Sequence, residues 1–202
     1  MKEQLIQNLI KDGCLKTSAI IEAFQEIDRK DFIPEELKYA AYEDRPLPIG
    51  RGQTISQPRV VAFMLELLEP KKGEKIMDVG SGSGWQSALL ANIIGQEGRV
   101  VAIERIPEIY RIGKDNCKKY GFKNIEFIQG DATVVQKKKG YFDKIVVAAA
   151  ARKVPESLKY QLKVGGRMVI PIRSSIFLLI KESEQGYIKK EFRGFLFVPL
   201  IQ

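Results

Sequence analysis

The chain of 202 residues contains no histidine. Imidazole is the base in Ser-His-Asp and Cys-His catalysis and a common ligand of catalytic metals, so the sequence excludes these kinds of site. It also excludes the one ordinary side chain whose unperturbed pKa suits general base catalysis near neutrality. Any reaction that this protein catalyses must therefore proceed without imidazole.

Cysteine is scarce, and Cys14 and Cys117 form no Cys-x-x-Cys pair. Neither a disulfide framework nor a thiolate zinc site is supported, and no bound metal is expected. Long apolar runs are absent too, since no stretch approaches the roughly 20 residues of a membrane-spanning helix. Residues 1–4 begin an amphipathic pattern without the apolar run of a signal peptide. We expect a cytoplasmic protein with no membrane partner.

Lysine and arginine outnumber the acidic residues, and the formal charge of +8 admits an anionic partner. The basic residues are dispersed, however, and the densest run, Lys137-Lys138-Lys139, precedes a Gly-Tyr turn, where a solvated loop is the simpler interpretation. The aromatic residues are not interleaved with basic ones as a stacking surface for single strands requires. We therefore do not expect nucleic acid as a partner, and we expect a monomer.

The first 70 residues predict helices and one irregular segment. Helical stripes are expected over residues 3–11 and after Thr17 or Ser18, either of which can cap the second helix. Residues 43–58 contain three prolines and two glycines, which forbid a regular helix or central strand across most of the segment. Pro58 suits the first turn of a third helix. Long irregular segments inside compact domains are usually functional or disordered, and this one is too apolar to be a linker.

Short apolar strands alternate with helices from Lys75 onward. The alternation predicts an α/β fold in which a parallel sheet is buried on both faces. We expect a single domain, 1–202, with N-terminal helices and an active-site loop in 1–70 and a Rossmann-like, doubly wound, mostly parallel sheet in 71–202. The expected strands cover residues 76–79, 100–104, 125–128, 145–148, 167–172, 176–181 and 187–198, with helices at 85–94 and 107–121 and a short one from Pro155 to near Gly165-Gly166.

A glycine-rich turn follows the first of these strands. Its glycines let the backbone approach a ligand closely, at the strand end where α/β sheets bind ligands. Glu104 closes the next strand, where its carboxylate can accept hydrogen bonds from both hydroxyls of a ribose. Asp131 can meet an adenine edge, although an aspartate at this place is more often a turn or cap residue. The expected cofactor-binding residues are Asp78, Gly80, Ser81, Gly82, Ser83, Gly84, Glu104, Asp131 and Ala132.

The spacing of the turn bears on the identity of the cofactor. Dinucleotide sites favour G-x-G-x-x-G with a pyrophosphate at the helix N-terminus. Here the pattern is G-x-G-x-G, and Asp78 lies two residues before it. A carboxylate at this point disfavours a diphosphate but can help to hold a cationic sulfonium ligand with a free amino group. The residues therefore favour S-adenosylmethionine over a nicotinamide dinucleotide.

Several further segments resemble the protein-L-isoaspartate (D-aspartate) O-methyltransferases. The segment Gly52-Gln53-Thr54-Ile55-Ser56-Gln57-Pro58 is similar to the active-site segment of that family, which methyltransferases in general do not share. The resemblance spans nearly the whole chain and implies the Rossmann-like fold of S-adenosylmethionine-dependent methyltransferases. The other matching segments are 31–34, 41–50, 78–84, 148–150, Pro155, 161–163, 165–171 and 197–200.

The resemblance implies methylation of the α-carboxylate of L-isoaspartyl residues in damaged proteins and peptides, with S-adenosyl-L-homocysteine as the other product. The methyl ester then collapses to a succinimide without the enzyme. Ser56 is implied as the active-site residue that touches this carboxylate, although it can also cap the helix at Pro58. A carboxylate is ionised at neutral pH and is its own nucleophile, so the lack of histidine is no handicap. The implied residues on the substrate side are Gln53, Thr54, Ile55 and Val198.

Three places depart from the family pattern. Arg59 stands where an aromatic residue or histidine is more usual, Trp85 replaces a tyrosine or phenylalanine, and 171–174 lacks the usual glycine. Two other functions stay open at this point: a methyltransferase of the same fold that acts on RNA or a small molecule, and a cofactor-binding module without catalysis. The small residues at 148–151 stand in place of an amino-methylation signature and favour a peptide substrate.

Overall fold

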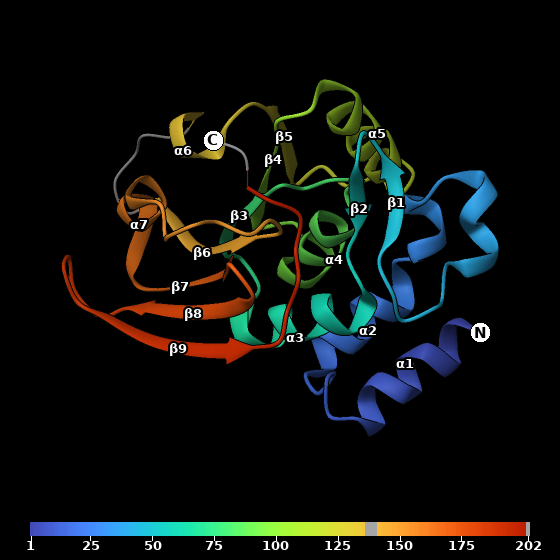
Figure 1. Cartoon of the computed structure of the whole chain (residues 1–202), viewed down its shortest axis with the longest axis horizontal. Coiled ribbons are helices and arrows are strands. Elements are labelled where there is room, and N and C mark those ends of the chain that lie inside the picture. The colour runs from blue at the N-terminus through green and yellow to red at the C-terminus, as the bar shows by residue number, and fades with distance from the viewer. Residues whose placement is uncertain (136–140, 201–202) are drawn as a thin grey trace.

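A seven-stranded sheet in the order β5-β4-β3-β6-β7-β8-β9 forms the centre of the protein (Figure 1). The structure is a computed structural model that describes residues 1–135 and 141–200. The strands from β5 to β7 run parallel, and β8 and β9 continue the sheet in antiparallel fashion. The strands are β3 (Lys75–Val79), β4 (Arg99–Glu104), β5 (Ile125–Gln129), β6 (Phe142–Val147), β7 (Leu162–Ile172), β8 (Ser175–Lys181) and β9 (Tyr187–Arg193).

Helices cover the two faces of this sheet unequally. The longer helices α3 (Pro58–Leu68), α4 (Trp85–Ile94) and α5 (Pro107–Lys118) pack on one face. The short helices α6 (Ala132–Val135) and α7 (Glu156–Gln161) contribute to the core on the other. This arrangement confirms the predicted Rossmann-like, doubly wound fold.

The order of the strands reverses at β3. The chain proceeds from β3 to β4 and β5 on one side and returns to β6 on the other. In open α/β sheets such a switch point leaves a crevice at the carboxyl ends of the strands, where ligands bind. The fold therefore places the glycine-rich turn, which follows β3, at the expected binding position.

The N-terminal region contains more regular structure than expected. Residues 43–58 were predicted to be irregular, but they include the hairpin of β1 (Leu47–Gly50) and β2 (Gln53–Ile55). Proline is tolerated here because the two strands form a sheet of their own and leave outer backbone groups unpaired. The other elements are α1 (Lys2–Lys11), α2 (Ser18–Glu26), and the 3₁₀ helices η1 (Arg29–Phe32) and η2 (Glu35–Ala40).

Two predicted boundaries near the C-terminus are wrong. Helix α7 ends at Gln161 because Leu162 already pairs with Phe142, and β7 then continues through a register shift. Strand β9 ends at Arg193 instead of residue 198, because the chain turns at Gly194, whose φ is 93°. The segment beyond this turn runs back over the strand ends (Figure 1).

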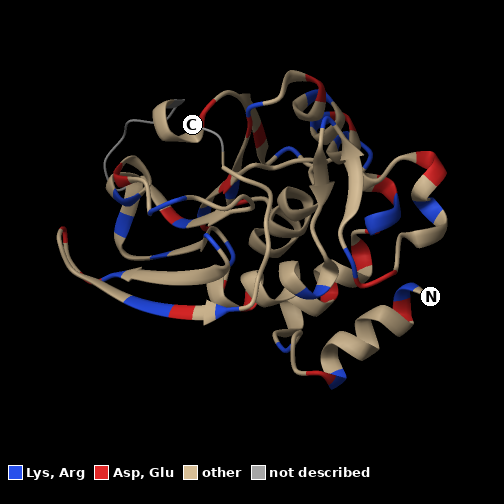
Figure 2. Cartoon of the chain, viewed as in Figure 1, with Lys and Arg blue, Asp and Glu red and all other residues tan. Residues whose placement is uncertain are grey.

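Other expectations concern composition. Among the described residues, no helix is long and apolar enough to cross a bilayer, and no group of three potential ligand side chains gathers to hold a metal. Lys and Arg residues are spread over many elements (Figure 2). The run Lys137-Lys138-Lys139 lies outside the described residues, so its predicted solvation stays a prediction.

Candidate active site

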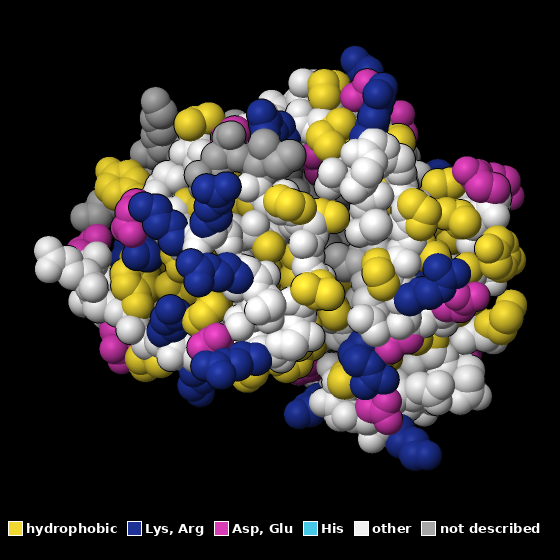
Figure 3. Space-filling view, viewed as in Figure 1, with side chains coloured by type: hydrophobic (Ala, Val, Ile, Leu, Met, Phe, Trp, Pro, Cys, Tyr) yellow, Lys and Arg dark blue, Asp and Glu magenta, His cyan; other side chains and the backbone are white. Residues whose placement is uncertain are grey.

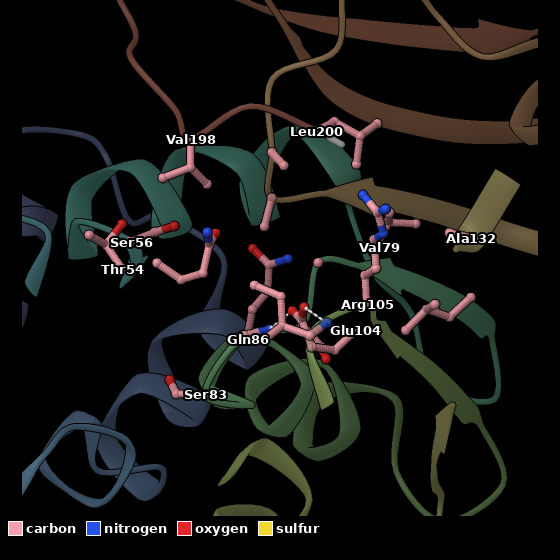
Figure 4. A pocket seen from close by; sticks show the side chains of 18 of the residues that line it. Thr54, Ser56, Val79, Ser83, Gln86, Glu104, Arg105, Ala132, Val198 and Leu200 are labelled. Carbon is pink, nitrogen blue, oxygen red and sulfur yellow. Dashed lines mark hydrogen bonds between the residues drawn. The ribbon is translucent and has the colours of Figure 1, made fainter. Parts of the chain in front are cut away.

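A cavity opens at the carboxyl ends of β3, β4 and β6, between the β1–β2 hairpin and the C-terminal segment (Figure 3). Ser56 and Val198 lie on one side of it and Glu104 on the other (Figure 4). The structure thus brings together residues that are far apart in sequence. Of the predicted site residues, those that line the cavity are Gln53, Thr54, Ile55, Ser56, Gly80, Ser81, Gly82, Ser83, Glu104, Asp131, Ala132 and Val198.

Asp78 is the first exception. Its side chain is fully buried and points to α4, where Oδ1 accepts a hydrogen bond from Gln86 (2.8 Å) and Oδ2 accepts one from Ser87 (2.5 Å). Burial raises the pKa of Asp78 to about 6, against the two hydrogen bonds that lower it. Asp78 does not line the cavity, so it does not lie where it was expected to hold a ligand's amino group. It orients Gln86, which does line the cavity.

Gly84 is the second exception, and its role is in packing. Its φ is 90°, and a Cβ on it would lie 2.7 Å from the backbone oxygen of Gly113 and 2.9 Å from the sulfur of Cys117. Gly113, on α5, is equally constrained, because a Cβ there would lie 2.5 Å from the oxygen of Gly82. Glycine at both positions lets α5 approach the turn closely. Gly113 was not predicted as part of the site, because the residues around a glycine inside a helix do not indicate which other element it packs against.

Glu104 supports the turn and faces the cavity. Its Oε2 accepts a hydrogen bond from the backbone N–H of Gly82 at 3.0 Å, and its Oε1 accepts one from that of Ile106 at 2.9 Å. A carboxylate has about four lone-pair positions, so each oxygen retains capacity to accept from a ligand hydroxyl. This geometry fits the predicted role of Glu104 in binding a ribose.

Asp131 has a structural role as well as a place in the cavity wall. Its Oδ1 accepts hydrogen bonds from the backbone N–H and the hydroxyl of Thr133, both at 2.8 Å. This is a capping arrangement at the start of α6, the alternative role foreseen for an aspartate here. Because Asp131 and Ala132 also line the cavity, capping and ligand contact are compatible.

The Ser56 segment is held by a buried arginine. Arg29, only 2% exposed, donates hydrogen bonds to the backbone oxygens of Ala41 (2.8 Å), Arg45 (2.9 Å) and Ser56 (3.1 Å) and a longer one to that of Glu43 (3.4 Å). Burial lowers the pKa of Arg29 to about 10, so the guanidinium stays cationic at neutral pH. Arg29 therefore connects both ends of the segment that carries Ser56.

The Ser56 hydroxyl does not cap α3. The cap residue is Gln57, without a side-chain hydrogen bond, and the backbone N–H of Arg59 instead donates to Asp44 Oδ1 at 2.9 Å. Within the described part of the chain the Ser56 hydroxyl has no hydrogen-bond partner, and its side chain lies at the cavity. It is thus available to a substrate.

Two polar atoms in the cavity wall are buried without a partner in the described structure, the Ser81 hydroxyl and the Trp85 ring N–H. Buried polar groups are nearly always hydrogen-bonded in native proteins, so unpaired ones at a cavity indicate a ligand with polar atoms. Together with Glu104, they fit an amphiphilic nucleoside better than an apolar ligand. The residues present therefore fit an adenosine-containing cofactor.

Sequence reasoning missed part of the wall. Arg105 and Ile106 directly follow Glu104, and Gln86 lies in the first turn of α4, just after the glycine-rich turn. These three residues could have been predicted from the sequence because they adjoin predicted site residues. Most of the apolar part of the wall carried no comparable signal, because such residues are typical of a strand or a core. Ala148, Ala149, Pro199 and Leu200 did lie in segments that resemble the family, but they were not predicted as site residues. The missed lining residues are Val61, Val79, Trp85, Gln86, Ile103, Arg105, Ile106, Gly130, Ala148, Ala149, Pro199 and Leu200.

The sequence profile described as protein-L-isoaspartate(D-aspartate) O-methyltransferase (PCMT) matches residues 1–202. The chain belongs to this family. A protein-L-isoaspartate O-methyltransferase of Ignicoccus hospitalis is 45% identical over 211 residues, covering 100% of this chain and 97% of the relative. One of Methanopyrus kandleri is 42% identical, covering 99% and 91%.

Solved structures agree with this membership of the PCMT family. A Plasmodium falciparum protein assigned to the same enzyme class, solved in complex with S-adenosyl-L-homocysteine, superposes with a TM-score of 0.88 at 27% identity, covering 98% of this chain and 97% of that one. A second protein-L-isoaspartate O-methyltransferase gives 0.87 at 31% identity, covering 98% of this chain and 65% of that one.

The structure accommodates the three departures from the PCMT pattern in different ways. Arg59 Nε donates to Asp44 Oδ2 at 2.9 Å and Nη2 to Asp12 at 2.7 Å, so it ties α1 to the segment before Ser56. Trp85 packs edge-on against Phe24, with ring centroids 5.4 Å apart. The turn at 171–174 places Arg173 at φ 55°, a conformation that glycine adopts more readily.

Proposed function

We propose that this chain transfers a methyl group from S-adenosylmethionine to the α-carboxylate of L-isoaspartyl residues, as the first step in repair of damaged proteins and peptides. The observation that carries the proposal is the position of Ser56, which faces the same cavity as the glycine-rich turn and Glu104. Membership of the PCMT family supports it. We further propose that residues 1–202 act as one domain, in which 1–70 supplies the substrate side and 71–202 the cofactor side.

The cofactor side is proposed to comprise the turn from Gly80 to Ser83 together with Glu104, Asp131 and Ala132. When bound there, S-adenosylmethionine supplies an electrophilic methyl group on a cationic sulfur. Glu104 would accept from ribose hydroxyls, and the unpaired Ser81 hydroxyl and Trp85 N–H would gain partners. Asp78 and Gly84 would act indirectly, through the shape of the turn.

The substrate side would bind and orient the carboxylate. Ser56 would donate a hydrogen bond to one carboxylate oxygen and leave the other free to attack, and it need not remove a proton, because the carboxylate is already ionised. Gln53, Thr54, Ile55 and Val198 would surround the peptide. Orientation of reactants in a site shielded from water lowers the barrier without an acid or base.

The remaining expectations about partners and location follow from this function. Isoaspartyl proteins and peptides are the proposed partners, and we propose that the protein is a cytoplasmic monomer without a membrane or nucleic-acid partner. A methyltransferase of the same fold acting on RNA or a small molecule is not favoured, because the relatives with whole-chain similarity are named as protein-L-isoaspartate O-methyltransferases.

Initial rates of label transfer from methyl-labelled S-adenosylmethionine test the proposal. The substrates are two synthetic peptides of the same sequence, one with an L-isoaspartyl and one with an L-aspartyl residue. We expect labelling of the isoaspartyl peptide alone. Equal labelling of both peptides, or none of either by protein that binds S-adenosyl-L-homocysteine, would refute it.

A further inference from the structure

A group of basic side chains lies beside the mouth of the cavity. In Figure 3, dark blue side chains gather over the part of the face formed by β7, β8, β9 and the loop after β6. The residues concerned are well exposed in the structure. We call these residues the basic lip: Arg152, Lys153, Arg173, Lys189 and Arg193.

The hydrogen bonding of the backbone brings the basic lip to the cavity wall. The N–H of Arg173 donates to the oxygen of Ala151 at 3.1 Å, so the turn after β7 lies against the loop that carries Arg152. That loop is bonded in turn to the cavity wall, since Ala150 N–H donates to Val198 O and Leu200 N–H donates to Ala150 O, both at 2.8 Å. The part of the lip that contains Arg152 and Arg173 is therefore continuous with the wall on the substrate side.

The charges of the lip are mostly uncompensated. No ion pair joins Arg152, Lys153 or Arg173 to a carboxylate in the part of the chain that the structure describes. Glu191 approaches Arg193 at 3.4 Å, but it also accepts a hydrogen bond from Ser175 at 2.8 Å. Many other basic side chains are paired with a carboxylate; for example, Arg59 contacts Asp12 and Lys163 contacts Asp143.

A polypeptide fits this surface better than a nucleic acid. Proteins that bind single strands combine basic grooves with exposed aromatic rings on which bases stack. The ring of Phe177, on the sheet face beneath the lip, is 8% exposed and lies under the Lys189 ammonium, 4.2 Å from the ring centroid. It offers no stacking surface.

We infer that the basic lip binds acidic residues that flank the isoaspartyl site, so that the preferred substrates are acidic segments of damaged protein. The inference rests on the proposed function and names its substrate class. A charged surface at the mouth of a site raises the local concentration of oppositely charged ligands. Because the lip is exposed, the preference will weaken at ionic strengths where the screening length is short.

Three isoaspartyl peptides of equal length test the inference, with glutamate, glutamine or lysine on both sides of the site. At low ionic strength we expect kcat/KM to be roughly tenfold higher for the acidic than for the neutral peptide, and lower still for the basic one. The difference should shrink in about 0.5 M salt. No turnover of any of the three peptides would refute the proposed function, whereas equal turnover of all three would refute only the basic lip.

Charge-reversal variants locate the effect. Arg152→Glu with Arg173→Glu is expected to abolish or invert the preference and leave kcat on the neutral peptide unchanged. The matched control is Lys72→Glu with Lys123→Glu, which makes the same change in net charge at exposed positions before β3 and β5, at the ends of these strands that lie away from the cavity. An equal effect of both pairs would overturn the inference.

Two further measurements keep the inference testable. Arg152→Gln with Arg173→Gln, a milder change, should remove the preference even if the reversed pair does not fold. A fluorescent single-stranded RNA should compete poorly with the acidic peptide. Strong RNA binding that the lip variants remove and the acidic peptide fails to displace would contradict the inference in favour of a nucleic acid.

Discussion

The Arg29 guanidinium nitrogen Nη2 lies 3.1 Å from the backbone oxygen of Ser56. The same buried group holds the oxygens of Ala41 and Arg45, so one side chain fixes the start and the end of the segment that forms the substrate side. In the described structure Arg29 forms no ion pair with a carboxylate, and its guanidinium donates to peptide oxygens instead. The position of Ser56 thus depends on a residue that lies outside the cavity.

Replacement of Arg29 by methionine should impair catalysis more than cofactor binding. The change removes the hydrogen bonds to the segment and leaves buried carbonyl groups unpaired, at a cost of about 2–4 kcal/mol in the free energy of unfolding. We expect kcat to fall by roughly tenfold or more, since misplacement of a substrate-positioning group by even ~1 Å is costly. Steady-state kinetics, urea unfolding and calorimetry with S-adenosyl-L-homocysteine measure the three quantities.

Arg29→Lys is the matched control for that variant. Lysine keeps the charge but cannot reproduce the planar fork that reaches several carbonyls. We expect it to recover part of kcat and of the stability. Full activity in Arg29→Met would show that the segment does not depend on this guanidinium.

Replacement of Ser56 by alanine should remove an interaction with substrate and little else. A hydrogen bond to a charged group contributes about 1.5–3 kcal/mol, so kcat/KM should fall roughly 10- to 100-fold. The hydroxyl does not cap α3, so the midpoint of urea unfolding should stay unchanged. Affinity for S-adenosyl-L-homocysteine should also persist, and its loss would place Ser56 on the cofactor side.

Replacement of Glu104 by glutamine should weaken cofactor binding. The carboxylate accepts from the backbone N–H of both Gly82 and Ile106, and a glutamine amide presents an NH₂ group to one of these donors. The turn must then shift or leave a donor unpaired. We expect the Kd for S-adenosyl-L-homocysteine to rise at least roughly tenfold, with the KM for peptide at saturating cofactor little changed; an unchanged Kd would contradict the assignment.

The buried Asp78 should make stability depend on pH. Its pKa rises from 3.8 to about 6 on folding, so the folded state holds the proton more tightly than the unfolded state. The stabilisation from this protonation is fully present below about pH 4 and is lost as the pH rises through 6, a change of about 3 kcal/mol.

Asp78→Asn isolates that contribution. The asparagine is neutral and of the same shape, so the difference in stability between wild type and variant should move in favour of the variant as pH increases from 4 to 7. Urea unfolding of both proteins across this range measures the difference. A difference that does not vary with pH would show that the carboxyl titrates normally.

Replacement of Gly113 by alanine should destabilise the cofactor side through packing alone. The new Cβ would lie 2.5 Å from the oxygen of Gly82, which forces α5 or the turn to move. Overpacking of this kind costs about 1–3 kcal/mol. Thermal unfolding and the Kd for S-adenosyl-L-homocysteine should both worsen, whereas Lys114→Ala, at the next and exposed position of the same helix, should leave both unchanged.

The sequence allowed the sheet and the two sides of the cavity to be predicted, because strands, the glycine-rich turn and the Ser56 segment each have a local pattern. The placement of Asp78 could not be predicted: its partners Gln86 and Ser87 lie in the first turn of α4, and only the packing shows that they donate to both carboxylate oxygens. Arg29 gave no signal for the same reason, since its partners are backbone oxygens 12 to 27 residues away. Long-range hydrogen bonds to backbone leave no trace in residue patterns.

The location of the transferred methyl group tests the central claim most directly. An equimolar mixture of the isoaspartyl and aspartyl isomers of one peptide is incubated with ¹³C-methyl S-adenosylmethionine, and tandem mass spectrometry of the promptly acidified mixture locates the label. We expect a methyl ester at the α-carboxylate of the isoaspartyl residue and no label in the aspartyl isomer. Label on the aspartyl isomer, at the peptide C-terminus or on nitrogen would contradict the proposed function.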